Sequence, residues 1–77
     1  MLWHLREAAE AIAGSLEEIR SDTDYDQGQL EHAMRHIYHH LNTAWNAQDA
    51  SQDRIDACSH EDWLAWRKFP TDIEMDV

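Results

Sequence analysis

Apolar residues recur every three or four positions along the first stretch of the chain, which is the spacing that places side chains on one side of an α-helix. Charged residues such as Arg6, Glu10 and Glu17 fall between them. The pattern therefore predicts an amphipathic helix over residues 2–20. The apolar positions of this first series are Leu2, Leu5, Ala9, Ile12, Leu16 and Ile19.

A second apolar series has the same spacing and predicts a second helix over residues 24–48. Asp24 is followed three residues later by Gln27, an arrangement typical of a capping box at a helix start. Because the turn between the two helices is short, we expect an antiparallel hairpin whose core is formed by the two apolar series. The second series consists of Leu30, Met34, Ile37, Leu41, Ala44 and Trp45.

The pattern changes after the hairpin. Residues 49–58 are mostly polar and read as a connector with at most one helical turn. Ser59 is a typical N-cap, and it predicts a short third helix over residues 60–69. Pro70 disfavours helical geometry in the residue before it, so the helix should stop there. Residues 70–77 are then expected to form an extended or flexible tail.

Length and charge narrow the functional classes. A chain of 77 residues has little core to divide, so we expect one all-α domain over residues 1–77. Sixteen acidic and six basic residues give a net charge of -10, which repels phosphate backbones and argues against direct nucleic-acid binding. Carboxylates can also imitate a nucleic acid, and this is a third functional hypothesis, although the acids here are scattered along the chain.

Membrane insertion and secretion are not expected. No apolar run approaches the roughly 18 residues that a spanning helix needs. Cys58 has no second cysteine to pair with, and no basic and apolar leader is visible. We therefore expect a protein of the reducing cytoplasm.

Several catalytic and metal motifs are incomplete. The segment "DTDYDQG" resembles the start of a calcium loop, but Ala33 stands where the bidentate glutamate belongs. The segment "HAMRH" has the histidine spacing of a zinc protease helix, and Ala33 again replaces the required glutamate. Cys58 and His60 are two positions apart and do not share a helix face. The sequence thus predicts a non-catalytic protein that needs no cofactor.

Four histidines occupy nine positions in "HAMRHIYHH", residues 32–40. On a helical wheel they gather on the side opposite the apolar series, so we expect them to face solvent. Histidines four apart are neighbours on a helix, and His32, His36 and His40 therefore permit two-point chelation of zinc or another transition metal. Metal binding is the alternative functional hypothesis, with further ligands supplied from outside this helix.

The tryptophans indicate where a partner would bind. If the hairpin is antiparallel, Trp45 lies at the end of the molecule to which Trp63 and Trp66 return, and we expect these three to pack in one cluster. Trp3 points away from the first apolar series. Because exposed tryptophan is enriched among interface anchors, Trp3, Trp63 and Trp66 are the candidate partner-binding residues.

These observations favour a small acidic protein that acts through protein-protein contacts in a binding or regulatory role. Two helices and a short third cover their apolar series incompletely. Small helical proteins often complete such a core by pairing into a four-helix bundle, so a homodimer is expected.

Overall fold

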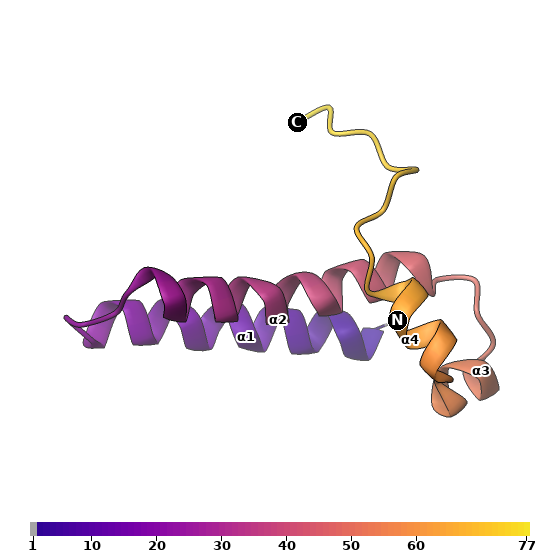
Figure 1. Cartoon of the computed structure of the whole chain (residues 1–77), viewed down its shortest axis with the longest axis horizontal. Coiled ribbons are helices and arrows are strands. Elements are labelled where there is room, and N and C mark those ends of the chain that lie inside the picture. The colour runs from indigo at the N-terminus through magenta and orange to yellow at the C-terminus, as the bar shows by residue number, and fades with distance from the viewer. Residues whose placement is uncertain (1) are drawn as a thin grey trace.

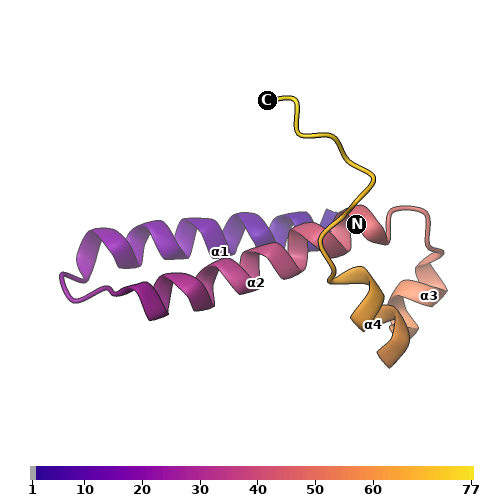
Figure 2. The same cartoon turned by 45° about the horizontal axis from the view of Figure 1, so that its top comes forward.

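The computed structural model describes residues 2–77, and it confirms the all-α hairpin predicted from the sequence. Two long helices, α1 (Leu2–Ser21) and α2 (Gln27–Asn46), pack side by side in antiparallel directions (Figure 1). The short helices α3 (Gln52–Ala57) and α4 (His60–Trp66) follow at the end of the hairpin where α1 begins. The residues after α4 form an extended tail that leaves this end of the molecule (Figure 2).

The start of α2 lies three residues beyond the predicted position. The capping box is present, but it is formed by Asp26 and Gln29 and not by Asp24 and Gln27. The Asp26 carboxylate accepts from the Gln29 backbone N–H at 2.8 Å, and the Gln29 side chain accepts from the Asp26 N–H at 3.0 Å. The backbone N–H of Asp24 instead donates to the Asp22 carboxylate at 2.9 Å. Such a local turn competes with helix geometry, so the helix begins at the next acidic residue.

The predicted connector contains a six-residue helix of its own. Ser51 caps α3 by accepting from the Arg54 backbone N–H, and Ser59 caps α4 by accepting from the Asp62 N–H at 3.1 Å, as predicted for Ser59. The Arg54 guanidinium also donates twice to the Asp62 carboxylate, at 2.7 and 3.1 Å. Between the helices Cys58 has a φ of 37°, in the left-handed region, which reverses the chain. These contacts fold α3 back onto the start of α4.

Polar side chains of α2 hold the end of α4. The Asn46 side-chain amide donates to the carbonyls of Trp66 at 2.8 Å and Lys68 at 2.7 Å. The Asn42 amide donates to the Arg67 carbonyl at 3.1 Å. The last carbonyls of a helix lack partners within it, and α2 supplies them here. Helix α4 consequently ends at Trp66 and not at residue 69.

The contact between α1 and α2 is formed mainly by small side chains, and the predicted hairpin core is wrong. Ala8 of α1 is buried, as are Ile37, His40 and Ala44 of α2. Small residues allow the two helix axes to approach closely, and the longer aliphatic side chains then have no room between them. Of the predicted core positions, Ile37 and Ala44 are buried, whereas the leucine and methionine side chains of the same series are exposed.

The apolar series of the two helices, which are not buried between α1 and α2, lie on the same side of the hairpin. In α1 the series lies about 60° around the helix from Ala8, and in α2 it lies about 100° from His40 and about 60° from Ala44, in the same rotational sense. Because the helices are antiparallel, both rotations lead to the same side of the pair. We call the resulting surface the apolar face; it comprises Leu5, Ile12, Leu16 and Ile19 of α1 and Leu30, Met34 and Leu41 of α2.

Helix α4 and the tail leave the apolar face uncovered. The end of α4 accepts hydrogen bonds from the side chains of Asn42 and Asn46. A helical wheel places both asparagines on a side of α2 that faces away from the apolar face. The first part of the tail rests against the outer edge of α2. There the Trp45 indole donates to Asp72 at 2.9 Å, and the Tyr38 and Phe69 rings meet edge to face.

Candidate functional site

A histidine pair joins the start of α1 to the end of α2. The Nδ1 atoms of His4 and His40 are 2.9 Å apart, and the His40 side chain is buried with 6% of its surface exposed. The prediction that all the histidines of α2 face solvent is therefore wrong at His40. The cause is the rotation of the hairpin, since α1 packs on the side of α2 that carries the histidines and not on the side that carries leucine and methionine.

Further aromatic rings surround this pair. The ring centres of His36 and His39 lie 4.8 and 5.1 Å from that of His40. Trp3 meets His4 and His40 edge-on, with ring centres 4.9 and 5.7 Å apart. We call His4, His36, His39 and His40 the histidine cluster. Sequence reasoning missed His4, because its membership depends on the register that places it opposite His40.

The 2.9 Å contact requires the two rings to play different roles in one hydrogen bond. A hydrogen bond between two Nδ1 atoms requires one to carry hydrogen and the other to present a lone pair. His4 and His40 must then be different tautomers when both are neutral. Which ring is the donor is not determined by the heavy-atom positions.

The environment of the cluster disfavours protonation. Burial lowers the pKa of His40 below the ordinary value of 6.5, and neighbouring His36 and His39 lower it further. Burial followed by the proximity of His40 lowers the pKa of His4, while the carboxylate of Glu7 opposes the shift at both rings. The pKa of His39 is lowered by burial, by His36 and by the Arg67 guanidinium. His4, His39 and His40 are therefore largely uncharged at neutral pH.

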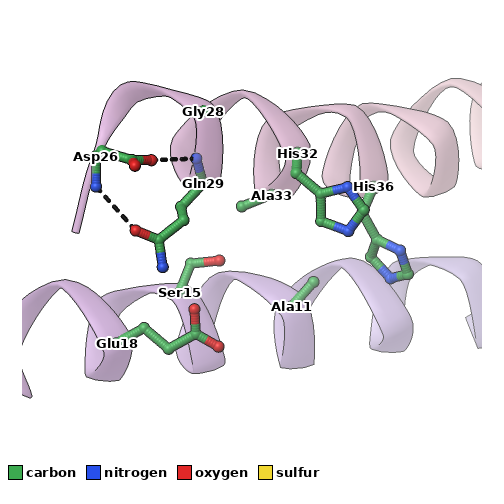
Figure 3. Close-up of a pocket in the computed structure, with 9 residues that line it drawn as sticks. All are labelled: Ala11, Ser15, Glu18, Asp26, Gly28, Gln29, His32, Ala33 and His36. Carbon is green, nitrogen blue, oxygen red and sulfur yellow. Dashed lines mark hydrogen bonds between the residues drawn. The ribbon is translucent and has the colours of Figure 1, made fainter. Parts of the chain in front are cut away.

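The three proposed metal ligands are not gathered around one point. His32 and His36 line an open groove of about 510 Å³ between α1 and α2 (Figure 3). His40 instead is buried and contacts His4 of α1. Glu18 and Asp26 lie towards the loop end of the same groove (Figure 3). Among residues 2–77, no set of three or more histidine, cysteine, aspartate or glutamate side chains is arranged to hold a metal ion.

The tryptophans occupy different environments and do not form the predicted cluster. Trp66 is buried, and the Arg54 guanidinium lies 5.5 Å from its ring centre. Trp63 is 38% exposed and is covered on one side by the Arg67 guanidinium, 4.1 Å from its ring centre. Within the described part of the chain, no ring contact joins Trp45 to either of them, and the Trp45 indole is engaged by the tail.

Trp3 keeps the exposure expected of a candidate anchor. Its side chain is 59% exposed, although one edge rests on the histidine cluster. Of the three predicted partner-binding residues, Trp3 and Trp63 are therefore accessible to solvent, and Trp66 is buried. The prediction that these residues bind a partner stays a prediction.

The apolar face is the second candidate site. Its seven side chains are each between 37% and 58% exposed. On a helical wheel, the side of α1 that carries the apolar face has no charged residue between Leu5 and Ile19. The corresponding side of α2 has none between Leu30 and Leu41. Sequence periodicity identified these residues correctly as one surface, but it assigned that surface to the interior.

No helix in the range 2–77 has the length and apolar character needed to cross a bilayer. Comparison with known proteins adds no constraint: no family model, curated protein or solved structure matches this chain. Function must therefore be inferred from these two surfaces and their chemistry.

Proposed function

We propose that this protein is a non-catalytic binding protein that acts through protein-protein contacts, with the apolar face as its contact surface. The observation that carries the proposal is that seven long aliphatic side chains on the two antiparallel helices are exposed to solvent. Contiguous apolar patches of this kind mark interaction sites on soluble proteins. The buried positions of the hairpin contact include Ala8, Ala44, Ile37 and His40, so the seven side chains of the apolar face are free for a partner.

The charge of the chain limits which partner is suitable. A net charge of -10 disfavours nucleic acid and anionic membrane surfaces, which leaves proteins as the class of partner. Cys58 is a free, exposed thiol, and a reducing compartment such as the cytoplasm would keep it in that state.

Site-specific photo-crosslinking tests this proposal. A photoreactive side chain is placed at Leu16, in the apolar face, and separately at Glu10, an exposed position of α1 outside that face. In cells that make the protein, we expect protein adducts from the Leu16 position and a much lower yield from the Glu10 position. Equal yields from the two positions, or none from Leu16, would contradict the proposal.

A further inference from the structure

We propose that the occupant of the apolar face is a second copy of this chain, stacked face to face so that two hairpins form a four-helix bundle. The inference rests on the proposed function, because it names the partner of the same surface. Three properties of that surface support it: its period, its area and its charge.

The spacing of the apolar face matches the spacing used by helices that pair along their length. In α1 the positions Leu5, Ala9, Ile12, Leu16 and Ile19 are separated by steps of four, three, four and three. In α2 the exposed positions Leu30, Met34 and Leu41 are separated by steps of four and seven, which fit the same period; Ile37, the position between the last two, is buried in the hairpin contact. This average period of 3.5 keeps an apolar seam facing a partner helix that crosses at roughly 20°.

The two helices are also equal in length. Each has 20 residues, which corresponds to about 30 Å. One hairpin therefore presents two seams of equal length and period, and two hairpins provide the four seams of a bundle core. A single partner helix would cover only part of this surface.

The exposed area is in the range that a dimer needs. At roughly 180 Å² for a fully exposed aliphatic residue, the seven residues of the apolar face expose on the order of 560 Å². Standard interfaces bury about 800 Å² on each partner, including a polar rim. The atoms bordering the seams supply that rim, so one copy of the hairpin is a sufficient partner for the other.

The charge distribution allows two copies of an acidic chain to meet here. The apolar face contains no charge, and the residues that border it on the wheel carry both signs: Arg6, Glu17 and Arg20 along α1, and Glu31 with its ion-pair partner Arg35 along α2. Stacking therefore buries no charge, and the remaining repulsion between copies is long-range and sensitive to salt.

This charge pattern gives the dimer a distinctive salt dependence. Because added salt screens repulsion between two copies that each carry -10, dimerisation should strengthen between low and physiological salt. Binding of a basic partner to an acidic chain would weaken over the same range.

The experiment is sedimentation equilibrium of the full chain from about 1 μM to about 1 mM, at two salt concentrations. We expect a monomer-dimer equilibrium for the wild type. Leu16→Glu places a charge within the seam, at the most exposed position of the apolar face, and should weaken the dimer by about 100-fold or more. Gly14→Glu adds the same charge to the same helix where a new Cβ meets no atom within 4 Å, and it should leave the dimer intact.

Circular dichroism of each variant separates loss of pairing from loss of folding. If Leu16→Glu loses its helices, Met34→Lys on the other helix takes its place in the same comparison. A wild type that stays monomeric to about 1 mM overturns the inference. In that case crosslinks from Leu16 to a different protein would leave the proposed function standing, and no crosslinks at all would overturn both. A dimer that survives both Leu16→Glu and Met34→Lys would show that the copies meet elsewhere.

Discussion

Asn46 should contribute a large share of the stability of the α4 contact. Replacing it with alanine removes two hydrogen bonds, to the carbonyls of Trp66 and Lys68. Each bond contributes about 0.5–1.5 kcal/mol net, so we expect Asn46→Ala to lower the free energy of unfolding by about 1–3 kcal/mol. For a domain of this size, that corresponds to a fall in melting temperature of roughly 4–24 °C.

A second substitution tests the geometry of the same contact. Asn46→Asp keeps the shape of the side chain, but its carboxylate cannot donate and would face two carbonyl oxygens, so it should destabilise more than alanine does. Urea unfolding followed by circular dichroism measures both variants. Gln48→Ala is the control, because Gln48 is exposed and its amide bonds only the nearby Trp45 carbonyl. Equal stability of Asn46→Asp and the wild type would refute the role assigned to Asn46.

Three further outcomes follow from the structure. Folding lowers the pKa values of His4, His39 and His40, so the folded chain binds fewer protons than the unfolded chain. The free energy of unfolding should therefore fall as the pH drops below about 6.5 and level off below the folded-state pKa values. Denaturant titrations from about pH 7.5 to pH 5 should show a smaller change of this free energy with pH in His40→Leu than in the wild type. Gly14→Ala should raise thermal stability by about 0.5–1 kcal/mol, measured by calorimetry, since the new methyl group meets open space in a helix interior. Cys58→Gly should stabilise by about 0.5–1 kcal/mol in chemical unfolding, because glycine adopts a φ of 37° without strain; a loss of stability would mean that the Cys58 side chain packs productively.

Local rules were sufficient to predict both long helices, α4 and the tail, but they assigned the residues of α3 to a connector. Period, caps and proline gave two long helices, a short one and a tail, and Ser59 begins its helix as expected. The error at the start of α2 came from competition between two acidic neighbours. Asp24 and Asp26 are both suitable caps, and only the turn formed by Asp22 decides between them.

The choice of helix face could not be made from one chain in isolation. The usual rule places leucine and isoleucine inside, and it failed at Leu5, Ile12 and Leu16. Helix α1 has a second face of small residues, including Ala8 and Ala11, which also permits packing. A rule based on burial in the monomer cannot distinguish a core seam from a seam reserved for another molecule. The burial of His40 was missed for the same reason, because it follows from that choice of face.

His4 and His40 can together bind two protons on acidification, and their contact gives these two protons different effects on the hydrogen bond. A first proton can bind the free Nε2 of the donor ring, which leaves the Nδ1 hydrogen bond in place and gives it a charged donor. A second proton must bind the accepting Nδ1, where it removes the lone pair and sets two cations against each other. The first proton therefore leaves the hydrogen bond of this junction in place, and the start of α1 should separate from α2 only after the second proton is bound.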